Sequence, residues 1–323
     1  MLKQILVSSV SAALLMSSLT GCAGISAKDK NKLSIVCTIF PEYDWTKEIL
    51  GSQFENADVT YLLDKGADLH NFQPTAKDMI TISECDLFIY VGGESDGWVA
   101  DALKSAKNKD MKVINLMEVM GDNAVEEEMK EGMMSEEEAE DEEEIEYDEH
   151  FWTSLKNAKL FCSEIYDALC ELDEKNADLY KQNYSDYSGK LDSLDSDFQT
   201  MVNESSVKTL VFGDRFPFRY FVDDYGLDYY AAFVGCSAET EASFETITFL
   251  ANKIDELNAD TIFVMENSDH SIAESIISNT KNKNQTITEL NSMQSVTSDM
   301  VKNGTTYLDL MQKNYDTLKE AFN

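Results

Sequence analysis

Short apolar runs alternate with amphipathic stretches along this chain in two separate series. Near-continuous apolar strands between helices are typical of parallel sheets that are covered on both faces. The sequence therefore predicts an α/β fold of two (β/α) lobes with parallel sheets. In the first series the predicted strands are 33–39, 59–63, 86–91 and 112–116, with helices around 45–50, 75–84 and 98–106. In the second they are 208–212, 228–233 and 261–265, with helices around 218–225, 243–257, 272–280 and from Thr305 onward.

A long helical pattern separates the two series. Its apolar positions recur at steps of three and four: Tyr180, Tyr184, Tyr187, Leu191, Leu194, Phe198 and Met201. They form one face of an unbroken helix of about 26 residues, about 39 Å long. Most such stripes are ordinary core packing, but this position favours a rigid helix joining two lobes. We therefore divide the mature chain into lobe 32–176, linking helix 177–204 and lobe 205–323, with a ligand expected in the cleft at the strands' carboxyl ends.

The first 22 residues have the features of a secretion signal. Lys3 precedes an apolar run from Ile5 to Met16, which is shorter than the roughly 20 residues that a membrane-spanning helix needs. The run is followed by Leu-Thr-Gly-Cys, ending at Cys22, which resembles a bacterial lipobox. We expect lipidation of Cys22 and a flexible tether over 23–31. The alternative is an ordinary signal followed by a chance cysteine.

Acidic residues dominate the charge of the chain. Its formal net charge is −35, which disfavours nucleic acid as a partner because phosphate would be repelled. The segment 126–149 is extreme, since 15 of its 24 residues are Asp or Glu. Self-repulsion predicts a solvated, mobile insert, either a loop or a disordered segment, that ends next to His150.

Cysteine usage does not indicate a disulfide framework. Five cysteines follow Cys22, and their number is odd, so at least one thiol is free. No Cys-x-x-Cys pair occurs, which also argues against a zinc ribbon. Three of the five lie in apolar surroundings and are expected in the core: Cys37, Cys85 and Cys162.

The chain has only three histidines, and each closely follows an acidic residue. They are His70 in Asp-Leu-His, His150 in Asp-Glu-His and His270 in Ser-Asp-His. All three lie at predicted strand or loop ends. So few imidazoles, placed in this way, favour collection of a transition metal over general acid–base chemistry.

Several motifs in a fixed order identify a family resemblance. The mature chain resembles the substrate-binding lipoproteins of zinc and manganese ABC importers. The likeness rests on Phe40-Pro41, Gly66-Ala-Asp-Leu-His70-Asn-Phe-Gln-Pro74-Thr, Asp86-Leu-Phe-Ile-Tyr-Val-Gly-Gly-Glu with Trp98, Asp148-Glu-His150-Phe-Trp152, Tyr225-Gly-Leu227 and Thr261-Ile-Phe-Val. It implies two lobes bridged by one long helix. It also implies a monomeric, non-enzymatic receptor that a lipid anchors to the extracytoplasmic face of the cell membrane. Such a receptor binds one divalent metal in its cleft and delivers it to an ABC permease.

The resemblance also implies the metal ligands. His70 and His150 match its first two ligand positions. A third is expected in Gly235-Cys236-Ser237, where this chain has no histidine, and a fourth near Asp269 and His270. The strand end Gly213-Asp214-Arg215 is a further candidate position. The expected ligands are therefore His70, His150 and His270, with Asp269, Cys236 and Asp214 as further candidates.

Alternatives remain for the last four residues. His270 could be a solvated loop histidine with Asp269 binding instead. Cys236 could be a small buried cysteine, and Asp214 could simply pair with Arg215.

The identity of the metal depends on the ligand types. Three histidines favour zinc, whereas two carboxylates beside two histidines would suit manganese or iron. A secreted metallohydrolase is disfavoured because no His-Glu-x-x-His motif occurs. A metal-independent, adhesin-like surface lipoprotein remains an alternative, and the metal content of the purified protein separates it from a receptor.

Overall fold

The structure is a computed structural model, and it describes residues 32–134, 146–237 and 241–322. Three parts of the sequence analysis lie outside the described residues. They are the predicted signal 1–22 with Cys22, the whole tether 23–31, and the centre of the acidic insert at 135–145.

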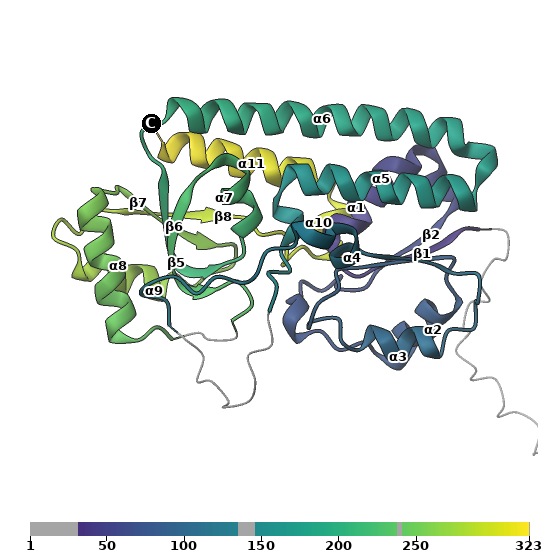
Figure 1. Ribbon diagram of the computed structural model, residues 1–323, viewed down its shortest axis with the longest axis horizontal. Coiled ribbons are helices and arrows are strands. Elements are labelled where there is room, and N and C mark those ends of the chain that lie inside the picture. Colours follow the sequence, from purple (N-terminus) through teal and green to yellow (C-terminus); the bar gives the residue numbers. More distant parts are fainter. Residues whose placement is uncertain (1–31, 135–145, 238–240, 323) are drawn as a thin grey trace, which may run out of the picture. The chain divides into compact units, whose positions relative to one another are not determined.

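Two four-stranded parallel sheets form the framework (Figure 1). The first has the order β2-β1-β3-β4 and the second the order β6-β5-β7-β8, so both halves repeat one topology. This confirms the predicted two-lobe α/β fold, although β8 was not among the predicted strands. The strands are β1 Ser34–Cys37, β2 Asp58–Tyr61, β3 Leu87–Tyr90, β4 Lys112–Asn115, β5 Thr209–Phe216, β6 Asp228–Val234, β7 Thr261–Met265 and β8 Thr286–Leu290.

Helices connect the strands, and many of them begin at a capping hydroxyl. The predicted start at Thr75 is confirmed, because Thr75 and Asp78 form a capping box at the head of α2. Ser154, Ser243, Thr297 and Thr306 cap four further helices, each through a side-chain oxygen that accepts a backbone NH of the first turn. The helices are α1 Phe40–Leu50, α2 Ala76–Glu84, α3 Val99–Lys104, α4 Leu116–Met120, α5 Leu155–Leu172, α6 Ala177–Glu204, α7 Arg219–Tyr225, α8 Phe244–Leu257, α9 Ser271–Asn279, α10 Ser298–Lys302 and α11 Tyr307–Ala321.

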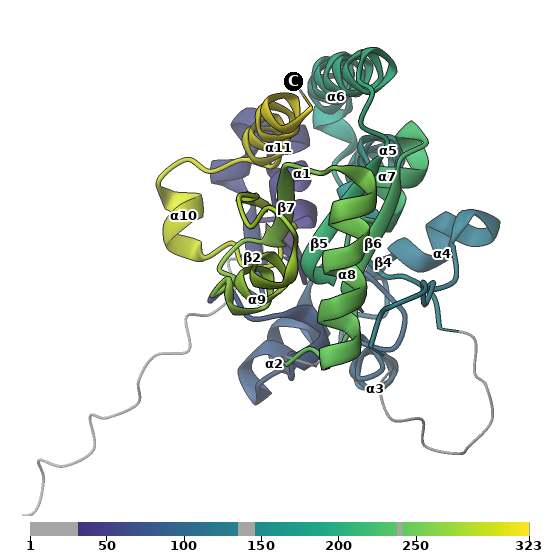
Figure 2. The same cartoon turned by 90° about the vertical axis from the view of Figure 1, so that its left-hand side faces the viewer.

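Side-chain alternation in the second sheet sorts its residues into two cores. Leu210 and Phe212 of β5 belong to the large core, whereas Val211 between them belongs to a smaller core. The smaller core is closed by α8 and α9, which contact β5 (Figure 2). Successive strand residues point to opposite faces, so both faces of this sheet are covered, as its apolar strands predicted.

The predicted linking helix is α6, which has 28 residues. Its apolar stripe is buried: Tyr180, Tyr187, Leu191, Leu194, Phe198 and Met201 all lie in the large core. It contacts α1 and α5 from the first half of the chain and α7 and α11 from the second (Figure 1). The helix is therefore packed against both halves rather than spanning a gap between them.

Buried hydrogen bonds also join the two halves. The Tyr307 backbone NH donates to Asp44 Oδ2 at 2.8 Å, and its hydroxyl donates to the Trp152 carbonyl at 2.7 Å. The Trp152 indole NH in turn donates to the Ser292 carbonyl at 2.7 Å. The start of α11 is thus fixed against α1 and against the segment that carries His150.

The described ends of the acidic insert are ordered against the second sheet. Lys130 pairs with Asp228, and the Met134 NH donates to the Ala232 carbonyl of the edge strand β6 at 3.0 Å. Glu126 and Tyr147 form an antiparallel bridge where the two ends meet. These residues form a loop, one of the two forms expected for the insert, and it is held by backbone pairing and by the ion pairs of Lys130 with Asp228 and of Arg219 with Glu128.

The five described cysteines are all free thiols. Cys37, Cys85 and Cys162 are buried, as expected for small core residues. No helix within the described residues is long and apolar enough to cross a membrane.

The buried Asp44 gives a prediction for stability. Burial raises the pKa of Asp44 to about 7, and its Oδ1 has no hydrogen-bond partner. An unfolded Asp ionises near pH 3.9, so this residue should reduce wild-type stability progressively as pH rises from about 4 to about 7. Asp44→Asn has no ionisable side chain at this position, so it lacks this pH-dependent loss of stability. Its unfolding free energy relative to wild type should rise across that window by up to about 4 kcal/mol and then level off.

Urea unfolding at several pH values measures this difference. Asp110→Asn, at an exposed position, is the matched control and should show no such trend. A pH-independent difference for Asp44→Asn would contradict the assignment.

Candidate metal centre

His70 is held by a short turn in the segment after β2. The turn is a 3₁₀ helix, Leu69–Asn71, and Asp68 caps it by accepting the His70 NH on Oδ1 at 3.1 Å. The Asp-Leu-His sequence therefore fixes the backbone of its own histidine. The His70 Nδ1 lies 2.7 Å from Ser95 Oγ and 3.8 Å from Glu149 Oε2.

His150 is completely buried and is oriented by Asp148. One oxygen, Asp148 Oδ1, accepts both the His150 NH at 2.8 Å and the ring Nδ1–H at 3.0 Å. The Asp148 carbonyl accepts the Tyr220 hydroxyl at 2.9 Å, which ties this segment to α7 of the second half. With Nδ1 as donor, the His150 Nε2 carries a lone pair.

The two imidazoles face each other through their Nε2 atoms, which are 3.2 Å apart. In the tautomer with Nδ1–H directed at Ser95 and Glu149, His70 also presents a lone pair at Nε2. Two lone pairs at this distance repel unless a cation lies between them. Tetrahedral zinc with bonds of 2.0–2.1 Å separates two nitrogen ligands by about 3.3 Å, so the spacing fits a shared metal ion.

The second half contributes Cys236, in the loop after β6. The ligand atoms of His70, His150 and Cys236 all lie within 4.8 Å of one another. Within the described ranges, this is the one such group of three or more His, Cys, Asp or Glu residues. Gly235 allows the close approach, because a Cβ there would lie 2.8 Å from His150 Cε1.

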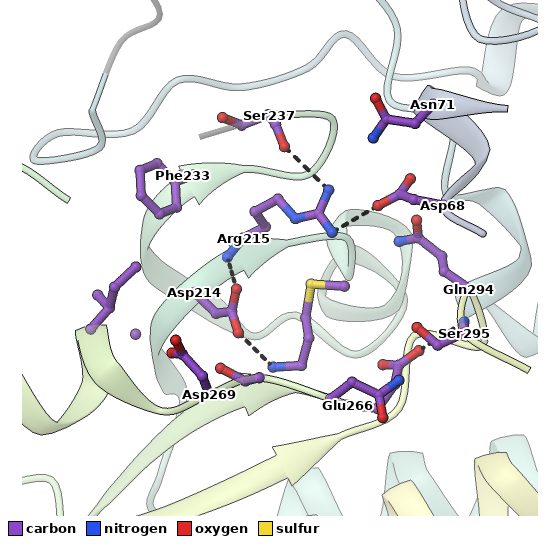
Figure 3. A pocket seen from close by; sticks show the side chains of 15 residues that line it. Asp68, Asn71, Asp214, Arg215, Phe233, Ser237, Glu266, Asp269, Gln294 and Ser295 are labelled. Carbon is purple, nitrogen blue, oxygen red and sulfur yellow. Dashed lines mark hydrogen bonds and ion pairs between the residues drawn. The ribbon is translucent and has the colours of Figure 1, made fainter. Parts of the chain in front are cut away.

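A β-bulge directs Arg215 toward the same place. The register of β5 against β6 shifts between Phe212 and Arg215, and bulges of this kind re-aim side chains next to sites. Arg215 Nη2 donates to Asp68 Oδ2 at 2.8 Å, and Nη1 donates to the Ser237 carbonyl at 3.2 Å (Figure 3). One guanidinium thus joins the segment that carries His70 to the loop that carries Cys236.

The other expected ligands lie elsewhere. His270 is the N-cap residue before α9 and has a left-handed φ of 65°, and its Nε2 is 3.5 Å from Glu289 of β8. Asp269 accepts the Ser271 NH at 2.9 Å, and Asp214 accepts the NH groups of Arg215 and Met265. The structure therefore brings Cys236 to the two matched histidines and does not bring His270, Asp269 or Asp214 there. The left-handed turn at His270 places its ring beside β8.

Burial and neighbouring charge shift several pKa values at the centre. Burial, followed by the nearby His150, lowers the pKa of His70 to about 4. Burial is the largest single influence on His150 and lowers its pKa, but the carboxylates of Asp148, Glu149 and Glu127 together outweigh it and raise the pKa. Burial and the nearby Glu127 raise the pKa of the Cys236 thiol, so metal binding by that sulfur would release a proton.

Four supporting residues were not named as site residues from the sequence. Asp68 and Glu149 lie inside the histidine motifs, so the sequence alone could have identified them as neighbours of the ligands. Ser95 and Arg215 reach the centre only through the fold, from the loop after β3 and from the bulge in β5.

A polar cavity of about 460 Å³ lies beside the centre (Figure 3). Asp68, Arg215 and Ser237 line it, which places it next to the supports of His70 and Cys236. Asp214, Glu266, Asp269 and Gln294 also line it.

Comparison with known proteins shows what the chain is similar to. A family model described as "Zinc-uptake complex component A periplasmic" matches residues 35–321. The chain is 26% identical over 296 residues to the zinc-binding protein AdcA of Streptococcus pyogenes, covering 90% of this chain and 56% of that protein. It is 27% identical over 303 residues to the zinc-binding lipoprotein AdcA of Streptococcus pneumoniae, covering 94% of this chain and 58% of that protein. The chain thus spans somewhat more than half the length of these two relatives.

Two further comparisons cover nearly whole chains. The high-affinity zinc uptake system protein ZnuA of Bacillus subtilis is 27% identical over 297 residues, with 90% of this chain and 88% of that protein covered. The crystal structure of the Zn(II)-bound ZnuA-like domain of S. pneumoniae AdcA has a TM-score of 0.70 at 26% identity. That match covers 90% of this chain and 99% of the domain.

Gly235 gives a structural prediction at the centre. Gly235→Ala should displace the His150 ring, because the new methyl would lie 2.8 Å from Cε1 and 3.0 Å from the Phe216 carbonyl oxygen. The chain has three histidines, so their Cε1–H signals can be resolved by NMR. We expect the His150 signal to shift most and His270 least. Gly189→Ala is the control, since a methyl there would meet no described atom within 4 Å. Three unchanged histidine signals in Gly235→Ala would contradict this packing.

Proposed function

We propose that this chain, which belongs to the zinc-uptake complex component A family, captures one zinc ion outside the cytoplasm and passes it to a membrane importer. The ligands in this proposal are His70, His150 and Cys236. One observation carries it: two imidazole Nε2 atoms face each other at 3.2 Å, with a thiol from the other half of the chain beside them. The family consists of uptake components, in agreement with the prediction that the chain is not an enzyme.

The ligand chemistry supports zinc over manganese or iron. Two imidazoles and a thiolate are nitrogen and sulfur donors, which zinc accepts readily in tetrahedral sites. Manganese prefers carboxylate and water oxygens. The carboxylates that would have supplied such a site, Asp214 and Asp269, lie outside the cluster and accept backbone NH groups instead.

Delivery completes the proposed role. Lipidation of Cys22 would hold the receptor on the outer face of the membrane, with 23–31 as its tether. The lipobox-like sequence and the name of the S. pneumoniae relative support this. The partner would be the permease of an ABC importer, and the receptor would act as a monomer.

Substitution of the ligands tests the proposal. His70→Ala and His150→Ala should each weaken zinc binding at least about 100-fold, or about 2.7 kcal/mol. Cys236→Ser should weaken it at least about tenfold, because a hydroxyl is a poorer zinc ligand than a thiolate. His270→Ala should have little effect and serves as the matched control. Competition with a fluorescent zinc chelator measures each affinity.

The opposite order, with His270→Ala more damaging than Cys236→Ser, would sink this ligand set. Wild-type protein purified from zinc-replete medium without bound zinc would instead favour the metal-independent, adhesin-like alternative.

The acidic insert gives a kinetic prediction. Residues 135–145 contain eight acidic side chains, which attract cations over the distance set by salt screening. Replacing all eight with Ser or Gly should slow zinc association several-fold at low salt, and the difference should vanish at high salt. The zinc dissociation rate should stay unchanged. Stopped-flow measurements at both salt concentrations separate the two rates, and a faster dissociation would show that this segment belongs to the site.

A further inference from the structure

We propose that the cavity beside the metal centre binds a small chelating amino acid, so that zinc is held as a ternary complex of protein, metal and amino acid. This inference rests on the proposed zinc site and names a second ligand for it. The amino acid would donate to the metal while its other polar groups bind the cavity wall.

The metal centre leaves room for an outside donor. Only three protein ligand atoms converge within the described residues, whereas zinc sites are almost always four-coordinate. The nearest further carboxylate oxygen of the cavity wall is Asp68 Oδ1, 4.0 Å from His70 Nε2. Asp68 is held in place, because Oδ1 accepts the His70 NH and Oδ2 accepts Arg215. The fourth position is therefore available to a molecule in the cavity.

The cavity adjoins the metal centre and has a suitable size, although none of the three ligand residues lines it. Asp68 lines it, and so does Ser237, the residue after Cys236. Its volume of about 460 Å³ falls within the roughly 300–1,000 Å³ of small-molecule sites.

Gln294 is the residue that points to an organic ligand. It is only 7% exposed, and neither its Oε1 nor its Nε2 has a hydrogen-bond partner. Buried amides are normally satisfied, so a group with both atoms free requires an explanation. In Figure 3 the amide lies beside Asp68 and near the Arg215 guanidinium. Its NH₂ can donate to a carboxylate, and its carbonyl can accept from an ammonium group.

Charges of both signs support a zwitterion. Arg215 contributes a guanidinium, and Asp214, Glu266 and Asp269 contribute carboxylates. A simple anion would meet an excess of like charge. A second metal ion is disfavoured, because these carboxylates do not form a ligand group within the described residues. An α-amino acid carries both charges and can also chelate zinc.

The experiment uses L-histidine as the probe and proceeds in two arms. In the first arm, native mass spectrometry and chelator competition measure zinc binding alone. In the second, L-histidine is added to metal-free and to zinc-loaded protein. We expect one zinc per chain in the first arm and one zinc plus one histidine in the second. Calorimetry should show histidine binding at least tenfold tighter to zinc-loaded than to metal-free protein.

Variants identify the cavity as the site. Gln294→Leu should weaken histidine binding to zinc-loaded protein at least fivefold while zinc affinity in the first arm stays within twofold of wild type. Gln294→Met is a second variant in case the first misfolds, and retained zinc affinity reports an intact fold. Gln312→Leu, at an exposed position on α11, is the matched control and should bind histidine as wild type does.

The outcomes are distinguishable. Zinc-loaded protein that retains no histidine overturns this inference and leaves the proposed function intact. Histidine binding that is unchanged in both Gln294 variants also overturns it. Failure to bind zinc in the first arm overturns the proposed function, and the inference with it.

Discussion

The metal centre depends on one buried segment, Asp148–Trp152, which bonds to both halves of the chain. Asp148 holds the imidazole of His150 through Oδ1 and accepts the Tyr220 hydroxyl through its carbonyl. Trp152 donates to the Ser292 carbonyl and accepts from Tyr307. A fully buried imidazole can bind a metal only if its unprotonated nitrogen points toward the metal. These bonds fix the orientation and the tautomer of the His150 ring. Because they reach both lobes, His150 cannot be positioned by either lobe alone.

The metal centre also depends on Arg215, which bonds to both lobes. Its bonds to Asp68 and to the Ser237 carbonyl set the separation between the first-lobe and second-lobe ligands. Burial opposes ionisation of Asp68, but Arg215 lowers its pKa, so the carboxylate remains charged beside the centre. Asp68 therefore serves two functions: it caps the turn of His70 and it anchors the opposite lobe. A site completed by contacts across a cleft is a natural arrangement for a carrier, because separating the lobes removes a ligand.

The sequence was sufficient for the framework and for selecting His70 and His150, which face each other in the structure, and the reasons are local. Strand periodicity, the capping residue Thr75 and the Asp-Leu-His turn all act within a few residues. The helix α5 was not predicted, although Ser154 caps it and its apolar spacing is regular, because the charge run before it dominates the local pattern. The sequence placed His270 ahead of Cys236 as third ligand, whereas the structure brings Cys236 to the two histidines. His270 follows β7 at the carboxyl edge of the second sheet. Its own left-handed backbone conformation directs its ring toward Glu289.

Cys236 was only a further candidate in the sequence, because its proximity to His150 depends on the side chain that Gly235 lacks. Gly235 lets the loop after β6 approach the ring of His150, and Gly213 lets β5 pack close to α9, because a Cβ at Gly213 would lie 2.8 Å from Ala273 Cα. Both close contacts join segments that are distant in the sequence, so they follow from the tertiary structure. A thiolate and two neutral imidazoles leave a bound zinc ion with one positive charge, close to the Arg215 guanidinium. That charge favours a further donor that is anionic and exchangeable, and a ligand of this kind would allow the ion both to be held and to be released.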